Sequence, residues 1–150
     1  MAGNGWQASM DGWGVTSSTN SPYGVASDYL GNVYWSEAGG NFLRKLSVTG
    51  YVSTIAGDGL RGFRAGDGTN SRFNSPQGIA VDDALTIYSA EFSNHMIRTV
   101  ASNGSTDVLV GGGGAVRGMA LAPPPACAPQ MAFALTTSAP FTLATLATIM

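Results

Sequence analysis

Two arginines lie within apolar, strand-forming stretches, where a positive charge needs a partner. Arg44 lies in the stretch 42–46 and Arg98 in the stretch 96–100, each on the same strand face as apolar side chains. Removing a guanidinium from water is costly unless an acid pairs with it. We therefore expect a structural ion pair at each arginine and no ligand contact. The candidate acids belong to the same or the adjacent module: Asp28 or Glu37 for Arg44, and Asp82 or Glu91 for Arg98.

The residue types that bind catalytic metals are too few to make a metal site. His95 is the single histidine, whereas a zinc site needs three or four protein ligands. Asp58 and Asp67 lie in Gly-Asp-Gly loops, but the loop at Asp67 lacks the closing acid of a calcium site. We predict turn roles for His95 and both aspartates. The sequence thus predicts no catalytic residue, no metal ligand and no cofactor, and the chain is not expected to be an enzyme.

Three further motifs resemble sites of known chemistry. The glycine runs 56–59 and 111–114 are not phosphate loops, because no Gly-Lys-Ser/Thr follows them. Cys127 is the single cysteine, which excludes an intramolecular disulfide. Asn103-Gly104-Ser105 matches the N-glycosylation acceptor pattern, which matters only in a secreted protein. Asn-Gly also favours a type I′ hairpin turn, with positive φ at both residues, and we expect that turn here.

Composition favours short strands over long helices. The 150 residues, 44% of them hydrophobic, suffice for one domain with a core. Only 11% are charged and the net charge is −2, so there is no basic surface for a phosphate backbone and nucleic acid is not an expected partner. The 21 glycines, with Asn, Ser and Thr around them, interrupt the chain at short intervals. This pattern predicts an all-β fold.

The chain repeats itself with a period of 54 residues and no gap. Pro-Tyr-Gly-Val-Ala-Ser-Asp at 22–28 returns as Pro-Gln-Gly-Ile-Ala-Val-Asp at 76–82. Periods of this size indicate stacked modules that bury their faces against one another. The positions that we identify as structural positions of the repeat are Gly24, Asp28, Tyr34, Glu37, Arg44 and Gly57 in the first copy, and Gly78, Asp82, Tyr88, Glu91, Arg98 and Gly111 in the second.

Each copy contains four short stretches typical of strands, separated by turns. They are 24–27, 33–36, 42–46 and 51–55 in the first copy, and 78–81, 86–90, 96–100 and 106–110 in the second. Four such strands make one small antiparallel sheet. Four-stranded units that recur at this spacing are typical of β-propeller blades.

The repeat divides the chain into four segments. Residues 1–21 are expected to be an inter-blade loop of a preceding blade, 22–75 the first blade with its connecting loop, and 76–111 the second blade. The glycine-rich connection 58–75 is expected on the surface, because a buried loop leaves backbone groups without partners. Residues 112–150 are rich in Gly, Ala, Pro and Thr and are expected to be disordered. A membrane helix over 131–150 is not expected, because this segment contains polar residues and Pro and lacks flanking basic residues.

In combination these motifs resemble the NHL repeats, a family of β-propellers. The resemblance covers residues 2 to about 111 and rests on Pro-x-Gly-Ile/Val-Ala-x-Asp, the Tyr strand, the apolar-Arg strand, Val-Ser-Thr-Ile-Ala-Gly-Asp-Gly and Phe-Asn-Ser-Pro. It implies a partial propeller of two four-stranded antiparallel blades. Glu37 and Glu91 depart from the family's usual Asp, and Ala84-Leu85-Thr86 replaces its usual Gly-Asn. We therefore expect an irregular first hairpin in the second blade.

The resemblance also implies a function. NHL-like propellers commonly present the loops of one rim to a protein, glycan or other ligand, so we expect a non-catalytic binding or scaffold module. Trp6 and Trp13 in the leading loop are candidates for a binding patch, and packing against a neighbouring blade explains them equally well. The alternative is a fragment of a catalytic propeller, similar to an amidating lyase or a lactonase, whose metal ligands lie in other blades.

Two blades are fewer than the four to eight that typically close a propeller ring. The outer faces, including those that carry Tyr34 or Tyr88, are expected to lack a partner in a monomer. The chain is therefore expected to need further blades or to self-associate.

Overall fold

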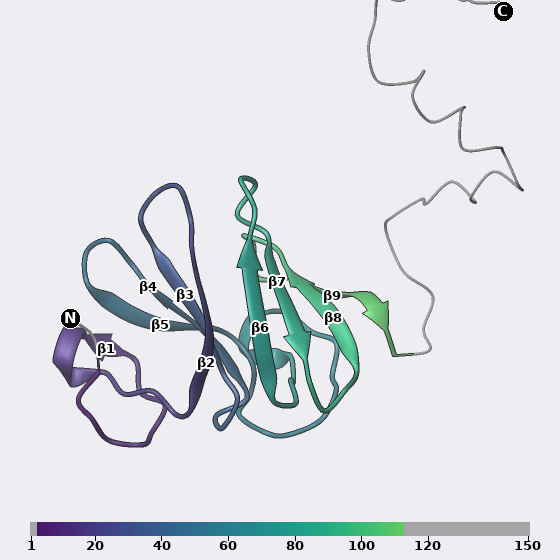
Figure 1. Cartoon of the computed structure of the whole chain (residues 1–150), viewed down its shortest axis with the longest axis horizontal. Helices are drawn as coiled ribbons and strands as arrows, with labels where there is room; N and C mark the ends of the chain where they lie inside the picture. The colour runs from purple at the N-terminus through teal and green to yellow at the C-terminus, as the bar shows by residue number, and fades with distance from the viewer. Residues whose placement is uncertain (1–2, 113–150) are drawn as a thin grey trace, which may run out of the picture. The chain divides into compact units, whose positions relative to one another are not determined.

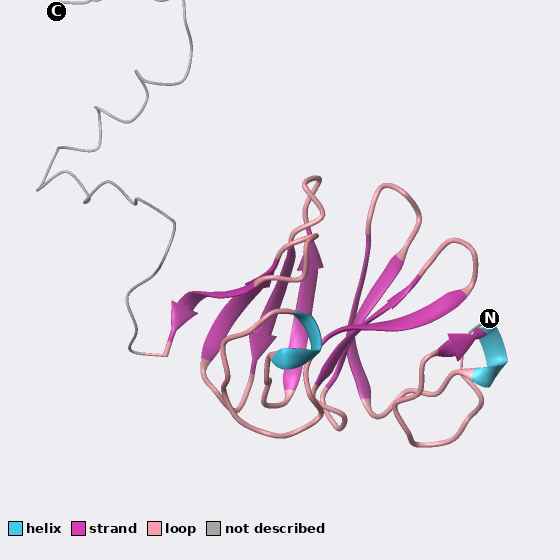
Figure 2. Cartoon of the chain, turned by 180° about the vertical axis from the view of Figure 1, so that it is seen from behind, coloured by secondary structure: helices cyan, strands magenta, loops and turns pink. Residues whose placement is uncertain are grey.

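The computed structural model describes residues 3–112, which form two antiparallel β-sheets (Figure 1). The predicted all-β fold is confirmed, since the other regular elements in this range are two three-residue 3-10 helices (Figure 2). No helix within residues 3–112 is long and apolar enough to cross a membrane. Cys127, the segment 131–150 and the rest of the expected tail beyond residue 112 lie outside the described residues.

The first sheet, here called blade 1, has five strands in the order β1-β5-β4-β3-β2. Its elements are β1 (Gly12–Trp13), the 3-10 helix η1 (Gly14–Thr16), β2 (Pro22–Ser27), β3 (Val33–Glu37), β4 (Phe42–Leu46) and β5 (Tyr51–Ala56). Strand β1 adds to the four strands that the sequence predicts. It lies in the segment 1–21, which we expect to be a loop, and pairs with Tyr51 and Val52 of β5. The leading segment is therefore part of the sheet.

The second sheet, blade 2, has four strands in the order β6-β7-β8-β9. Its elements are the 3-10 helix η2 (Gly68–Asn70), β6 (Pro76–Val81), β7 (Ile87–Glu91), β8 (Met96–Val100) and β9 (Thr106–Gly111). The innermost strands β2 and β6 start two residues earlier than predicted, at Pro22 and Pro76, and each has an irregular register just after the proline. Proline is tolerated there because the first residue of a strand need not donate to the ladder.

The first hairpin of blade 2 is regular, so our expectation of an irregular one is wrong. Leu85 has φ 61° where Gly31 in blade 1 has φ 87°. The Leu85 N–H donates to the Asp82 carbonyl at 3.0 Å, and the Gly31 N–H donates to the Asp28 carbonyl at 3.1 Å. Leucine thus adopts a left-handed conformation at a cost of roughly 1–2 kcal/mol. The surrounding hydrogen bonds maintain the same turn with either residue.

The hairpin at Asn103 forms, but its turn is not type I′, so that prediction is wrong. Gly104 has φ 90°, whereas Asn103 is not among the residues with positive φ. The Gly104 N–H donates to the Ala101 carbonyl at 2.8 Å, and the Ala101 N–H donates to the Ser105 carbonyl at 2.9 Å. The loop is thus longer than a two-residue turn, and a left-handed glycine completes it. Because of this extra length, Asn103 needs no positive φ.

The hydrophobic core lies between the two blades. Its buried members are Tyr34, Leu43 and Ala56 from blade 1, Ile87 and Val100 from blade 2, and Phe73 from the segment that connects them. Tyr34 is only 4% exposed, so our expectation that its face lacks a partner is wrong. This face of blade 1 packs on blade 2. The opposite face, here called the open face, is covered only in part by the leading segment, which buries Glu37 and Arg44 but leaves Val25 exposed. Tyr88, on the outer face of blade 2, is half-buried.

The blades approach each other closely at Gly24 of β2. The Ser36 hydroxyl donates to the Gln77 carbonyl of β6 at 2.7 Å and accepts from the Gly24 N–H at 3.0 Å. A Cβ at Gly24 would overlap the Gln77 carbonyl oxygen and lie 3.2 Å from the Ile79 nitrogen. Glycine is needed here because another backbone occupies the space of a side chain.

The connecting segment 58–75 packs against blade 2 and does not simply lie on the surface. Ser71 and Phe73 have no exposed area, so the expectation of a surface loop is wrong for this part. The Gly68 N–H donates to the Gly104 carbonyl at 2.8 Å. Blade 2 thus supplies hydrogen-bond partners for backbone groups of the segment, so its burial does not leave them unpaired.

Candidate functional site

A buried arginine joins blade 1 to the segment that precedes it. Arg44 and Glu37 have no exposed side-chain area, and the guanidinium nitrogen Nη1 lies 2.8 Å from the carboxylate. Nη2 donates to the Met10 carbonyl and to the Asp11 carboxylate, both at 2.9 Å, and Nη1 also donates to the Ser18 carbonyl at 3.5 Å. Arg44 therefore fastens two separate parts of the leading segment to the sheet.

Arg98 forms the corresponding cluster in blade 2. Its Nη1 lies 3.3 Å from the Glu91 carboxylate and donates to the Arg72 carbonyl at 2.7 Å. Its Nη2 donates to the Arg64 carbonyl at 3.3 Å and to the Thr106 hydroxyl at 2.7 Å. Burial raises the pKa of Glu91 above its ordinary value, although Arg98 opposes the shift. The cluster thus binds the connecting segment to blade 2.

Each arginine pairs with one of its predicted acids, the glutamate of its own blade, and Arg44 has a second acidic partner, Asp11, which the prediction missed. An aromatic ring lies beside each guanidinium, but it comes from different places. In blade 1 the ring is Trp35 of β3, 5.9 Å from the Arg44 guanidinium carbon. In blade 2 two rings of the connecting segment lie beside the Arg98 guanidinium carbon, Phe73 at 4.4 Å and Phe63 at 5.2 Å. Both arginines therefore have an aromatic neighbour, which comes from a strand in blade 1 and from the connecting segment in blade 2.

The aspartates of the repeat, Asp28 and Asp82, each close a hairpin and therefore do not pair with the arginines. The Tyr34 hydroxyl donates to Asp28 at 2.9 Å, and the Tyr88 hydroxyl donates to Asp82 at 3.0 Å. Backbone N–H groups of each hairpin donate to the same carboxylates. Burial alone would raise the pKa of Asp28, but hydrogen bonds, first of all the one from the Asn32 side chain, outweigh it and lower the pKa. The pKa of Asp82 is lowered chiefly by the backbone of Thr86.

Tyr34 links stability to alkaline pH. Burial and the adjacent Asp28 raise its pKa to about 12 from an ordinary value of 10.0. Its contribution to stability is therefore complete below pH 10 and is lost as the pH rises through about 12, because the unfolded chain ionises first. We expect the free energy of unfolding to fall less over this window in Tyr34→Phe than in the wild type, as measured by urea titration at several pH values. Equal slopes for Tyr34→Phe, the wild type and the exposed-site variant Tyr29→Phe would contradict this linkage.

The other residues that could bind ligands occupy ordinary structural positions. Arg72 donates to the Asp58 carboxylate at 2.8 and 3.0 Å, and this pairing lowers the pKa of Asp58. His95 is exposed in the turn after β7, with φ 55°, and Asn103 is exposed in its hairpin. No group of three or more His, Cys, Asp or Glu residues within 3–112 is placed to hold a metal ion.

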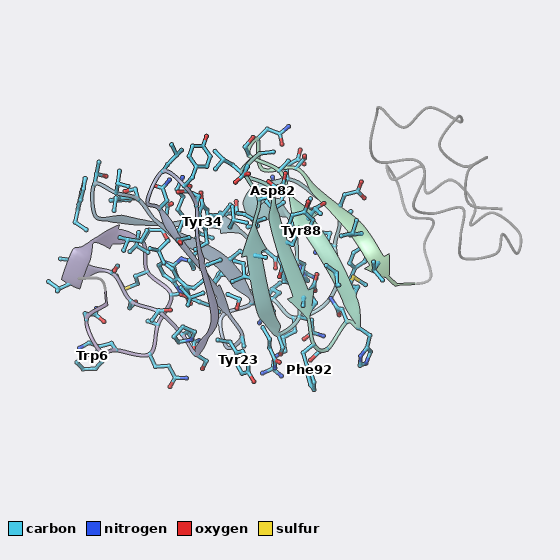
Figure 3. The ribbon with its side chains drawn as sticks, turned by 45° about the horizontal axis from the view of Figure 1, so that its top comes forward. Trp6, Tyr23, Tyr34, Asp82, Tyr88 and Phe92 are labelled. Carbon is cyan, nitrogen blue, oxygen red and sulfur yellow. The ribbon has the colours of Figure 1, made fainter. Side chains whose placement is uncertain are left out.

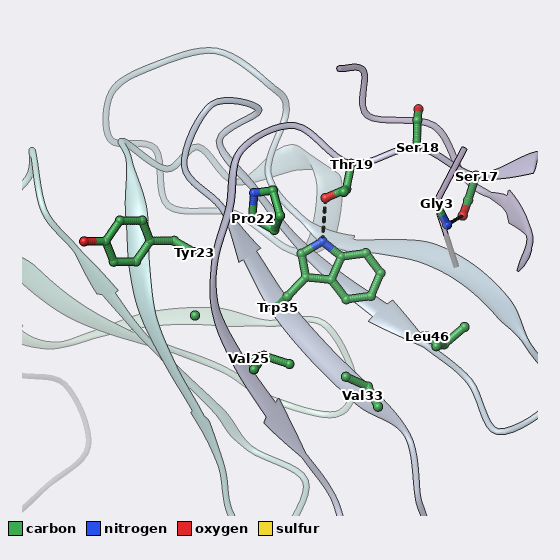
Figure 4. Close-up of a pocket in the computed structure, with 11 residues that line it drawn as sticks. Gly3, Ser17, Ser18, Thr19, Pro22, Tyr23, Val25, Val33, Trp35 and Leu46 are labelled. Carbon is green, nitrogen blue, oxygen red and sulfur yellow. Dashed lines mark hydrogen bonds between the residues drawn. The ribbon is translucent and has the colours of Figure 1, made fainter. Parts of the chain in front are cut away.

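A cleft of about 430 Å³ lies on the open face of blade 1, opposite the face that packs on blade 2 (Figure 4). The indole nitrogen of Trp35 donates to the Thr19 hydroxyl at 2.9 Å, which fixes the ring in the cleft. Most of the lining is apolar. The lining residues from the sheet are Pro22, Tyr23, Gly24, Val25, Val33, Trp35 and Leu46, and those from the leading segment are Gly3, Ser17, Ser18 and Thr19.

Large apolar side chains gather at one edge of the blades, where β2 and β6 begin and β3 and β7 end. Trp6, Tyr23 and Phe92 lie along this edge, with Tyr34 and Asp82 toward the opposite one (Figure 3). We call Trp6, Tyr23, Leu60 and Phe92 the apolar rim; their exposures are 76%, 69%, 58% and 65%.

The repeat relates two members of the apolar rim, Trp6 and Leu60. The Trp6 N–H donates to the Asn4 side chain, and the Leu60 N–H donates to the Asp58 side chain, both at 3.0 Å. The two turns are 54 residues apart, so each blade presents one apolar residue on the same kind of turn. Sequence reasoning singled out Trp6 but missed Tyr23, Leu60 and Phe92. The pairing of Asn4-x-Trp6 with Asp58-x-Leu60 was the available signal.

Comparison with known proteins places the fold among β-propellers. A protein of unknown function from Bacteroides thetaiotaomicron has a TM-score of 0.59 and 31% identity, over 67% of this chain and 26% of that one. An auxiliary nutrient binding protein from the same organism has a TM-score of 0.56 and 25% identity, over 63% of this chain and 26% of that one. These structures are propeller-like, so the two sheets described here are propeller blades.

Sequence comparison identifies one curated relative. Protein SUPPRESSOR OF QUENCHING 1, chloroplastic, from Arabidopsis thaliana, is 30% identical over 98 residues, which are 65% of this chain and 9% of that protein. No protein-family model matches the chain. The chain thus spans less than a tenth of this relative and about a quarter of the solved propellers.

Proposed function

We propose that the chain supplies two NHL-type blades of a β-propeller and acts as a non-catalytic binding or scaffold module through the apolar rim. The observation that carries this proposal is the pair of equivalent turns that expose Trp6 and Leu60. Several large exposed apolar side chains gathered along one edge are typical of a surface that binds a partner. The NHL assignment is supported by the 54-residue repeat and by the Arg–Glu clusters at the same position in each blade.

The chemistry of the apolar rim indicates its kind of ligand. Trp6 and Tyr23 are amphipathic aromatic residues, which are enriched in the centres of protein interfaces. Asp58, which shapes the turn at Leu60, is neutralised by Arg72, so it adds little net charge to the surface. A peptide segment with apolar anchors fits such a surface. The binding role of the structural relative described as a nutrient binding protein is consistent with a ligand-binding propeller.

A peptide-display selection tests this function. Peptides selected on the immobilised wild-type chain are expected to carry aromatic or aliphatic anchors. The combined variant Trp6→Ser/Tyr23→Ser/Phe92→Ser is expected to bind them at least ~10-fold more weakly, since anchor residues each contribute more than about 1 kcal/mol.

The matched control changes exposed apolar residues at the opposite edge of the blade. Tyr29 and Leu30 lie in the hairpin after β2 and are 70% and 52% exposed. Tyr29→Ser/Leu30→Ser should retain full peptide binding. If both variants bind equally to the wild type, the apolar rim is not the binding surface.

A further inference from the structure

The outer face of blade 2 repeats the face of blade 1 that is buried between the blades. The 54-residue offset relates buried Tyr34, Leu43 and Ala56 to Tyr88, Ile97 and Val110. Leu43 and Ala56 have no exposed area, whereas Ile97 is 38% and Val110 is 55% exposed. Blade 2 thus carries a second copy of an apolar contact surface, which the other described residues leave partly exposed.

The open face of blade 1 repeats the other half of the same contact. Ile87 and Val100 of blade 2, which belong to the same buried core as Tyr34, correspond to Val33 and Leu46 of the cleft. Ile79, which packs against the core, corresponds to Val25, which is 70% exposed. The apolar residues at the cleft are therefore the repeat counterparts of residues that form the core with Tyr34.

The surface of blade 2 that contacts blade 1 and the cleft surface of blade 1 also match in aromatic content. Phe73 and Ser89 at the internal contact correspond to Thr19 and Trp35 at the cleft. Each surface therefore has one large ring and one small hydroxyl residue, in exchanged positions. The two side chains together therefore fill a similar volume on each surface, as a closely packed interface requires.

Gly78 provides an independent sign that a strand approaches the outer face of blade 2. It is the counterpart of Gly24, whose missing side chain makes room for the Gln77 carbonyl across the internal contact. Gly78 is exposed, lies within a strand and has no positive φ. Glycine within a strand weakens it and often marks a site where another backbone comes close. By the offset, that backbone is residue 23 of β2.

We infer that the open face of blade 1 binds the outer face of blade 2 of a second copy of this chain, head to tail. The contact repeats the one seen between blades 1 and 2, with Tyr88 seated against Val33 and Leu46. In a head-to-tail pair, one chain still has a free open face and the other still has a free outer face. Further copies can therefore add until the last copy binds the first and closes a ring. Each copy adds two blades, so rings of about four to eight blades contain two to four copies.

Analytical ultracentrifugation of the whole chain over a range of concentrations tests the association. The wild type is expected to form species of two to four copies. Ile97→Lys on the outer face and Val25→Lys on the open face should each weaken association at least ~30-fold, because the contact would bury an unpaired charge. Tyr29→Lys is the control, since Tyr29 is 70% exposed in the hairpin after β2 and its repeat counterpart Asp83 is exposed; it should associate like the wild type.

Mixing the two interface variants tests the head-to-tail geometry. Ile97→Lys retains an intact open face and Val25→Lys an intact outer face, so the equimolar mixture should form a complex of two chains and stop there. This gain of mass also demonstrates that both variants are folded. A wild type that remains a monomer at all concentrations overturns the inference, as does a mixture that stays monomeric while the wild type associates.

Discussion

Replacing Arg98 with methionine is expected to lower the free energy of unfolding by about 3–5 kcal/mol, the cost of breaking a buried ion pair by removing one partner. The substitution would leave the buried Glu91 carboxylate without its counter-charge. It would also leave the Arg64 and Arg72 carbonyls without the donor that fastens the connecting segment to blade 2. Urea unfolding of the purified variant, at a concentration where the chain is monomeric, measures the loss.

Two companion variants separate the causes of this loss. Arg61 is exposed, so Arg61→Met should change stability by no more than about 0.5 kcal/mol. In the double variant Arg98→Met/Glu91→Gln the buried charge is gone, and part of the stability should return. A loss below about 1 kcal/mol in Arg98→Met would mean that the arginine cluster does not hold the blade together.

Gly24→Ala is expected to destabilise the chain by about 3 kcal/mol, at the upper end of the usual cost of overpacking. The added Cβ overlaps the Gln77 carbonyl oxygen, and this oxygen is held by the Ser36 hydroxyl. Strand β6 would have to move away from β2, which would open the core between the blades. Unfolding followed by tryptophan fluorescence, together with the exposure of the buried Tyr34 to solvent, reports the change.

Gly78 supplies the matched control, because it is the repeat counterpart of Gly24 on an exposed strand. A Cβ at Gly78 would meet only the Ala90 Cβ, at 3.2 Å. Gly78→Ala should therefore cost no more than about 1 kcal/mol in the monomer. Equal effects of the two substitutions would show that the close approach of β2 and β6 does not limit packing.

The repeat made the strands predictable from local sequence. Short β-prone stretches bounded by Gly, Asn and Asp determine where strands can start and stop, and the observed limits differ from the predicted ones by at most two residues. The hairpin at Leu85 was mispredicted because local preference disfavours leucine with positive φ. The hydrogen bonds of the Asp82 turn outweigh that preference.

The candidate site was less predictable, because its members come from segments far apart in the chain. Trp6 and Leu60 have no special spacing within either copy, and only the shared turn shows that they are equivalent. The cleft combines β2, β3 and β4 with the leading segment. No local pattern indicates that residues 17–19 fold back beside Trp35.

The sequence by itself determined that this chain is all-β, that it contains two equivalent modules, and that each module holds an arginine in need of an acid, because these features depend on local residue types and on their period. Only the tertiary structure decided which acid is the partner. Asp28 and Asp82 are bound by their own hairpins, so Glu37 and Glu91 pair with the arginines, and Asp11 of the leading segment is a second partner of Arg44. The structure also decided which face is buried: Tyr34 is covered and Trp35 lies in an open cleft, because strand alternation defines two faces but only the contact between blades chooses between them.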